Sequence, residues 1–319
     1  MTVLTYFVEL REERLCELFQ RPGLLDRLAE RPSTAISMAI LDLSPGRAQT
    51  IHALNARGIP VTAWLVLDEA EGYWLTADNA DHAHHRYHEV RRWAERERLR
   101  FDAMGLDIET PHEDSLALVR HGREAFARLL RRRRSRAALD DAARQYARLI
   151  DEIRGDGLRV ESYQFPLVLD ERRARSTFLQ RTLGFVDVAP DREVLMLYRS
   201  LLPGPLGEAL VDTYGPGAQA IGVGITGGGV DFVLDAVGLR TLDLERLITD
   251  LRRARRYTDQ LYVFSLEGCV EEGHLDALSR ADLERPVAPA RLSGLARVAR
   301  AALRAALRAE KLWDRLLDG

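Results

Sequence analysis

The chain has 319 residues, of which 46% are hydrophobic, so it can bury a sizeable core and general disorder is excluded. Its formal net charge of -3 gives no overall attraction to nucleic acid or to an anionic membrane surface. Cys16 and Cys269 are too few for a disulfide framework, which fits a reducing compartment.

The first residues, MTVLTYFVEL, lack the basic segment, apolar stretch and small-residue cleavage site of a secretory leader. This segment predicts a β-strand instead. No run approaches the roughly 18 uninterrupted apolar residues that a membrane span requires. We therefore expect a cytoplasmic protein with neither a membrane nor a nucleic acid as its partner.

Eight short apolar runs, rich in β-branched and aromatic residues, recur along the chain with helical patterns between them. They are Val3 to Glu9, Ala35 to Asp42, Pro60 to Leu67, Ala103 to Glu109, Arg159 to Phe165, Val194 to Arg199, Ala218 to Thr226 and Leu261 to Glu267. Strict alternation of strand and helix predicts a parallel sheet covered by helices. Eight units favour a (β/α)8 TIM barrel in the α/β class. The alternative is an open doubly wound sheet, but no G-x-G-x-x-G follows the first run.

Two segments extend the repeating pattern. Residues 114–154 predict a helical insertion after strand four, a helix pair whose arginine run at 131–136 forms a solvated, salt-bridged face. Residues 288–318 predict a long C-terminal helix that packs on the barrel or on a second copy, which leaves a homodimer open. With no linker or repeat, residues 1–319 are expected to form a single domain.

The fourth apolar run ends on two carboxylates. In FDAMGLDIETP, residues 101–111, Asp107 and Glu109 lie two residues apart and so share one face of a strand. Leu106 and Ile108 then face the outer helices. The two acids should point into the barrel mouth at the C-terminal end of their strand, where barrel enzymes place their catalytic groups.

Other predicted strands end on polar or aromatic residues. Glu9, Asp42 and Glu267 add acids at the same rim, although Asp42 could equally cap the following helix. Strand five offers Tyr163 or Gln164 at its end, and strand six offers Tyr198. Trp74, in the polar loop DEAEGYWLTADNAD, is placed to stack on a sugar ring, whereas Trp64 inside strand three reads as core.

Clustered carboxylates in a partly dry mouth predict cleavage of a glycosidic bond. Repulsion and burial hold one acid protonated near neutral pH while another stays charged. The protonated acid can donate to the leaving oxygen, and the charged one can stabilise the cation-like sugar carbon. A small intracellular or imported carbohydrate is the expected substrate.

The segment DAMGLDIE resembles the strand-four signature D-G-x-D-x-D-x-E of the chitinase-like hydrolases of family eighteen. Asp102, Asp107 and Glu109 match, whereas Ala103 and Gly105 depart from the pattern. The resemblance implies that Glu109 is the general acid. It also implies that Asp107 orients a substrate acetamido group, whose carbonyl attacks the anomeric carbon.

Strand six carries a second part of the resemblance. Met196-Leu197-Tyr198-Arg199 is similar to the family pattern M-x-Y-D, with Arg199 in place of the acid. The resemblance implies that Tyr198 contacts the acetamido oxygen. Glu267 suggests another mechanism, in which it acts as nucleophile or base. A carboxyl separation from Glu109 of about 5 Å would suit retention, and one of roughly 7 to 9 Å would suit inversion.

Two further function classes stay open. The barrel could bind carbohydrate without catalysis, or it could be a metal-dependent sugar isomerase or hydrolase that uses histidines from DHAHHRYHEVRRW. There, His84 and His88 share a helix face at i,i+4. No H-E-x-x-H is present and no predicted strand ends on histidine, so the expectation is no metal and no cofactor.

Overall fold

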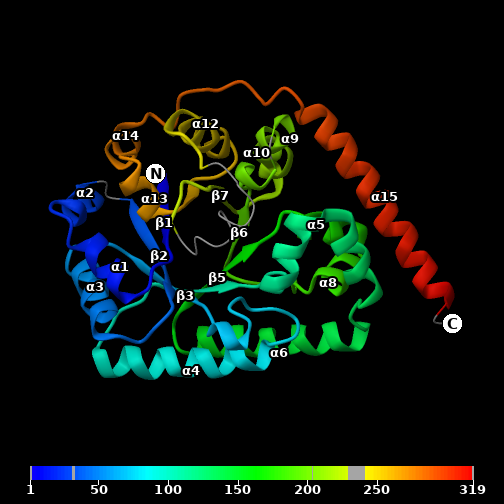
Figure 1. The fold of residues 1–319 in the computed structure, drawn as a ribbon, viewed down its shortest axis with the longest axis horizontal. Coiled ribbons are helices and arrows are strands. Elements are labelled where there is room, and N and C mark those ends of the chain that lie inside the picture. The colour runs from blue at the N-terminus through cyan, green and yellow to red at the C-terminus, as the bar shows by residue number, and fades with distance from the viewer. Residues whose placement is uncertain (1, 31–32, 203, 229–240, 318–319) are drawn as a thin grey trace.

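A computed structural model describes residues 2–30, 33–202, 204–228 and 241–317. In this part of the chain, eight parallel strands form a closed barrel in sequence order, with β1 paired to β8 (Figure 1). The predicted (β/α)8 barrel is confirmed, and the open sheet is excluded. The strands are β1 (Val3–Val8), β2 (Thr34–Ile40), β3 (Val61–Leu65), β4 (Ala103–Asp107), β5 (Arg159–Gln164), β6 (Arg192–Met196), β7 (Ala220–Gly224) and β8 (Gln260–Phe264).

Helices surround the barrel, and short ones follow several strands. They are α1 (Glu12–Phe19), α2 (Leu24–Glu30), α3 (Pro45–Ala56), α4 (Ala80–Glu97), α5 (His112–Arg131), α6 (Arg136–Gly155), α7 (Val168–Ala174), α8 (Phe178–Leu183), α9 (Pro205–Glu208), α10 (Leu210–Tyr214), α12 (Leu244–Arg255), α13 (Leu266–Glu271), α14 (Leu275–Arg280) and α15 (Ser293–Leu317). The described residues also form the 3-10 turns η1 (Glu69–Glu71), η2 (Arg199–Leu201) and η3 (Gly215–Gly217).

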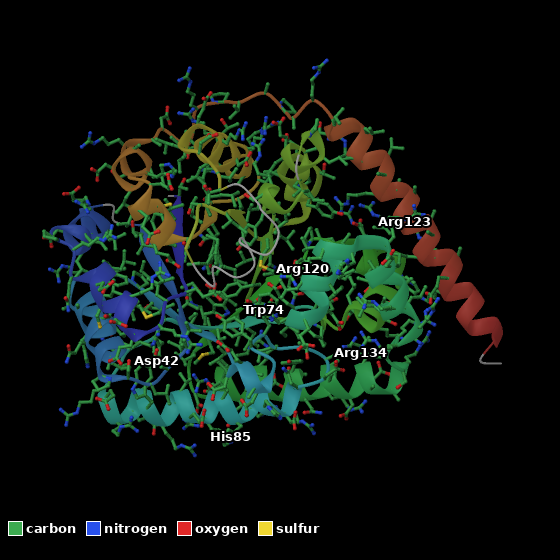
Figure 2. The ribbon with its side chains drawn as sticks, in the orientation of Figure 1. Asp42, Trp74, His85, Arg120, Arg123 and Arg134 are labelled. Atoms are coloured by element: carbon green, nitrogen blue, oxygen red, sulfur yellow. The ribbon has the colours of Figure 1, made fainter. Side chains whose placement is uncertain are left out.

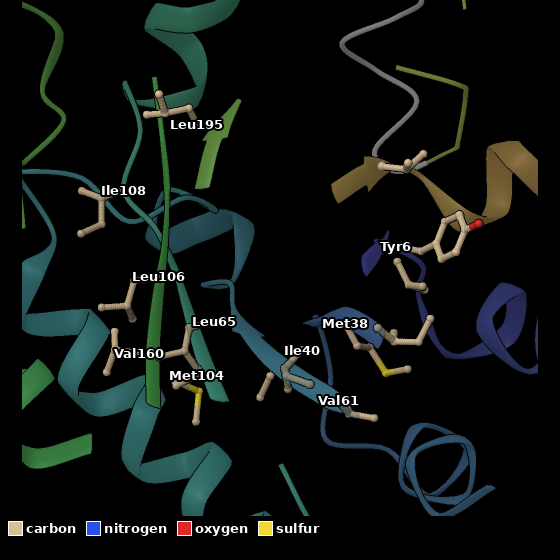
Figure 3. Close-up of a cluster of buried hydrophobic side chains, with 14 of the residues drawn as sticks. Tyr6, Met38, Ile40, Val61, Leu65, Met104, Leu106, Ile108, Val160 and Leu195 are labelled. Carbon is tan, nitrogen blue, oxygen red and sulfur yellow. The ribbon is translucent and has the colours of Figure 1, made fainter. Parts of the chain in front are cut away.

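The strand pleat divides the buried side chains into two clusters. Leu106 and Ile108 of the β4 segment belong to the larger cluster, between the barrel and the helices (Figure 3). Phe7, Trp64 and Tyr163 belong to the smaller cluster, which fills the inside of the barrel. Both faces of the sheet are therefore apolar, which explains why the strands read as near-continuous hydrophobic runs.

The predicted insertion after strand four is a helix pair, α5 and α6. Ser135 begins α6 by accepting a hydrogen bond from the Ala138 backbone N–H at 3.1 Å. Several arginines of the run at 131–136 form ion pairs, including Arg134 with Asp78, as a salt-bridged face requires. None of the helices in the described ranges is both long enough and apolar enough to cross a bilayer.

The C-terminal helix lies along the outside of the molecule (Figure 1). It is held by the fully buried Asp170 of α7, whose carboxylate accepts from Arg300 at 3.0 Å and from Arg304 at 2.7 Å. The Arg300 guanidinium also lies 3.8 Å from the centroid of the Tyr214 ring. These contacts explain how an arginine-rich helix packs on the barrel. The homodimer stays a prediction.

Strand eight is shorter than the sequence pattern indicated. It ends at Phe264 because the Ser265 side chain accepts a hydrogen bond from the Gly268 backbone N–H and begins α13. Glu267, predicted at the end of a strand, is in the first turn of that helix. Its side-chain direction is therefore set by the helix and not by the strand pleat.

Candidate active site

A cavity of about 150 Å³ opens at the C-terminal ends of the strands. Aromatic side chains from several strands and loops make most of its wall, and three carboxylates reach it. The aromatic residues are Phe7, Trp64, Trp74, Tyr163, Phe165, Tyr198 and Phe264, and the acids are Glu9, Asp107 and Glu109. This end of a (β/α)8 barrel is where enzymes of this fold hold their substrates.

The β4 segment supplies the two central acids. Asp107 is 3% exposed and Glu109 is 9% exposed, and both side chains line the cavity. Gly105, one pleat earlier, lies under the Tyr163 ring, where an added Cβ would be 2.9 Å from two ring carbons. The Tyr163 hydroxyl is in turn hydrogen-bonded to Ser37 at 2.6 Å. Tyr163 therefore occupies the space that a side chain at position 105 would need.

Asp107 and Glu109 form a coupled pair. Burial, followed by the adjacent Glu109 carboxylate, raises the pKa of Asp107 well above its usual range. Burial also raises the pKa of Glu109 to about 7; the hydrogen bond with Asp107 acts in the opposite direction, and the charge of Glu9 adds to the rise. Two carboxyls that share a dry site do not both ionise at neutral pH, so the pair retains a proton there.

Glu9 reaches the same cavity from the end of β1. It is 6% exposed, and its Oε1 accepts a hydrogen bond from the Tyr73 hydroxyl at 2.6 Å. Tyr73 has a left-handed backbone, with φ of 64°, in the loop between β3 and α4. Such a conformation is costly for a bulky residue and persists where surrounding contacts hold it. The loop thus orients Glu9 toward the other two acids.

Tyr198 follows β6 and lines the cavity with its ring. Burial raises its pKa well above the usual value, and the nearby charges of Asp107, Glu109 and Glu9 act in the same direction. The phenol therefore stays protonated and can donate a hydrogen bond to a ligand. Arg199, the next residue, forms ion pairs with Glu208 at 2.7 Å and with Asp250 at 3.3 Å.

Trp74 lines the cavity, and Figure 2 shows it near the centre of the molecule. Its ring contacts His112, at the start of α5, with centroids 5.1 Å apart, and Tyr73 with centroids 6.0 Å apart. A fixed aromatic ring beside buried carboxylates suits the apolar face of a pyranose.

The remaining predicted residues lie outside the cavity lining. The Glu267 carboxylate is buried behind Glu9 and accepts from the Glu9 backbone N–H at 3.1 Å. Gln164 is fully buried, and its amide donates to the Val186 carbonyl at 3.4 Å. Asp42 pairs with Arg47 at 2.7 Å; burial opposes ionisation, but hydrogen bonds from Arg47 and Ser44 lower its pKa to about 2. Glu267, Gln164 and Asp42 therefore hold neighbouring backbone or side-chain groups in place and do not line the cavity.

Sequence reasoning missed several lining residues, among them Phe7, Phe264 and Ser115. Phe7 could have been found, because it precedes Glu9 by two residues and so shares its strand face. Ser115 could not, because it reaches the cavity from α5, whose path over the barrel mouth depends on tertiary packing.

The histidine-rich segment is on the outer helix α4. The His84 Nε2–H donates to the Gln145 carbonyl oxygen at 2.9 Å, and His88 lies 3.5 Å from Glu152 of α6. Within the described ranges, no group of three or more histidine, cysteine or acidic side chains could hold a metal ion. The i,i+4 histidines thus contribute to contacts between α4 and α6.

We expect the acid pair to make the stability of the protein pH-dependent. The folded-state pKa of Glu109 is raised, so the folded protein binds more protons than the unfolded chain between about pH 4.5 and 7, and stability falls as pH rises through that window. Glu109→Gln should therefore gain up to about 3 kcal/mol relative to wild type between pH 5 and pH 8. Urea unfolding of both proteins at the two pH values measures this; a constant difference would show that Glu109 titrates normally.

The sequence matches no protein-family profile and no curated protein. Solved structures share the fold. The PgaB (BpsB) glycoside hydrolase domain from Bordetella bronchiseptica superposes with a TM-score of 0.52 at 10% identity, covering 90% of this chain and 100% of that one. A GH18 chitinase from Pseudoalteromonas aurantia has a TM-score of 0.50 at 8% identity, covering 88% and 99%. A D-allulose 3-epimerase from Methylomonas sp. has a TM-score of 0.44 at 12% identity, covering 83% and 85%. The chain thus has a barrel fold found in carbohydrate-active enzymes.

Proposed function

We propose that the protein is a glycoside hydrolase in which Glu109 donates the proton to the leaving oxygen. The observation that carries this proposal is the coupled pair Asp107 and Glu109, which holds a proton at neutral pH on the wall of an aromatic cavity. A raised carboxyl pKa is what a general acid needs near neutral pH. The cavity, at about 150 Å³, suits a single small ring, well below the roughly 300–1,000 Å³ of sites for drug-sized ligands.

The residues that line the cavity favour a substrate-assisted mechanism, in which the acetamido group of the sugar attacks the anomeric carbon. Asp107, Glu109 and Tyr198, three of the residues that match the family-eighteen patterns, line one cavity, whereas Glu267 lies outside its lining. A 2-acetamido sugar would place its carbonyl oxygen between the Tyr198 hydroxyl and the anomeric carbon, with Asp107 orienting the amide N–H. Glu109 would protonate the departing oxygen and then, as carboxylate, activate the water that completes hydrolysis.

The departures from the family pattern do not remove these groups. Gly105 stands where the family has an acid, and Tyr163 fills that space. Arg199 stands where the family has a second acid, and its guanidinium points to Glu208 and Asp250 instead of into the cavity lining. The chemistry would therefore depend on one carboxylate pair, with burial first, and the charge of Glu9 after it, raising the pKa of Glu109.

A panel of 4-nitrophenyl glycosides tests the proposal. The N-acetyl-β-D-glucosaminide should be hydrolysed. With an alkyl N-acetyl-β-D-glucosaminide, whose leaving oxygen needs a proton, kcat/KM should fall above about pH 7 as Glu109 loses its proton. Addition of EDTA should leave the rate unchanged, which would separate this chemistry from a metal-dependent isomerase or hydrolase. Sugar binding without turnover of any glycoside would overturn the proposal in favour of a non-catalytic carbohydrate-binding barrel.

A further inference from the structure

Three exposed leucines lie in the segment that follows β6 and Tyr198. Leu201, Leu202 and Leu206 are 36%, 46% and 51% exposed; Leu201 ends η2, Leu202 follows it, and Leu206 is in α9, which packs on η2. Leu201 also lines the cavity that holds Asp107 and Glu109. We call these three residues the leucine rim. Exposed apolar side chains gathered beside a pocket mark a binding surface more often than scattered ones do.

The leucine rim is held firmly against the barrel. Gly207 of α9 packs on the backbone of η2, where an added Cβ would lie 2.7 Å from the Arg199 carbonyl oxygen and would collide with the Leu202 carbonyl. The Arg199 side chain bridges Glu208, at the end of α9, and Asp250 of α12. Arg199, the residue that replaces the family acid, thus fixes the rim instead of entering the cavity.

The segment that carries the leucine rim has no charged side chain. Residues 200–207, SLLPGPLG, carry no charge in a chain of which 30% is charged. The Ser200 hydroxyl already donates to the Gly224 carbonyl at 3.1 Å and accepts from the Ile225 N–H at 2.9 Å. A second sugar unit at this place would find few partners for its hydroxyl groups, and buried hydroxyls without partners are costly.

We propose that the leucine rim binds an aliphatic aglycone, so that the substrates are glycosides of apolar alcohols. This inference rests on the proposed function, because it assigns the sugar ring to the cavity and the leaving group to the rim. A ring that fills a cavity of about 150 Å³ leaves only its substituent to project outward, and Leu201 is shared by the cavity and the rim. Burial of the alkyl chain of the aglycone against the leucine side chains provides the affinity.

The test measures binding of methyl, butyl and octyl N-acetyl-β-D-glucosaminide to the Glu109→Gln protein by calorimetry, below the micelle-forming concentration of the octyl compound. Each methylene removed from water is worth about fourfold in affinity when fully buried, so the octyl compound should bind at least about tenfold more tightly than the methyl compound. Leu202→Ser and Leu206→Ser should reduce that preference to about threefold or less. Val298→Ser, at a 66% exposed site on α15, is the matched control and should retain it.

The outcomes separate the two proposals. Equal affinity for the three compounds, or a preference that survives the leucine substitutions, overturns the leucine rim even if the protein hydrolyses glycosides. A chain-length preference that the leucine substitutions remove, in a wild-type protein without turnover, supports the rim while the proposed hydrolase activity fails. Failure of the octyl compound to bind also overturns the rim.

Discussion

Glu109→Gln should lower kcat/KM about 10²- to 10⁴-fold, the usual contribution of a general acid. Glutamine keeps the shape of the side chain but cannot release a proton to the leaving oxygen. The loss should be larger for an alkyl glycoside than for a 4-nitrophenyl glycoside, because nitrophenolate departs without much help from an acid. Steady-state rates of the two substrates with wild-type and variant protein measure this dependence on the leaving group.

Two further variants show whether the effect belongs to Glu109. Glu95→Gln, on the exposed face of α4, removes an acid that pairs with Arg91 and should leave the rate unchanged. Glu267→Gln decides between mechanisms. If Glu267→Gln lowers the rate as far as Glu109→Gln does, the mechanism is double displacement with Glu267 as the nucleophile, and the substrate-assisted mechanism is wrong. An equal loss with alkyl and nitrophenyl leaving groups would contradict proton donation by Glu109.

Gly105→Ala should destabilise the protein by about 1–3 kcal/mol or more, as overpacking of a filled core does. The added methyl group would lie within 2.9 Å of the Tyr163 ring, which neighbouring aromatic side chains hold in place. Phe7 and Trp64 both contact that ring at 4.9 and 5.8 Å between centroids, so it has little room to move. The free energy of unfolding from urea titration measures the loss.

A double-mutant cycle assigns that loss to Tyr163. In the Tyr163→Ala background the collision is removed, so Gly105→Ala should cost much less than in wild type. Gly294→Ala is the matched control, because its Cβ would meet open space at the start of α15, and it should be neutral or stabilising. Equal costs in both backgrounds would show that Tyr163 does not determine the glycine at position 105.

The spacing of apolar residues predicted the barrel because strand and helix periods are local properties. Eight runs with helices between them favour a closed barrel, which buries both faces of a parallel sheet. The pleat of strand four likewise placed Asp107 and Glu109 on one face and Leu106 with Ile108 on the other. The structure has both acids on the cavity and both aliphatic residues in the outer core.

The directions of the other acidic side chains depended on hydrogen bonds and helix starts that the spacing of apolar residues does not encode. Arg47, on the helix after Asp42, holds that carboxylate outside the cavity lining, and the helix that begins after Ser265 turns Glu267 behind Glu9. Tyr73, 64 residues from Glu9, orients the carboxylate that does reach the cavity. The sequence by itself determined which side chains share a strand face, because the pleat repeats every two residues. Only the tertiary structure decided which acids meet, because contacts between distant segments, such as those of Glu9 with Tyr73 and Glu267, set their final positions.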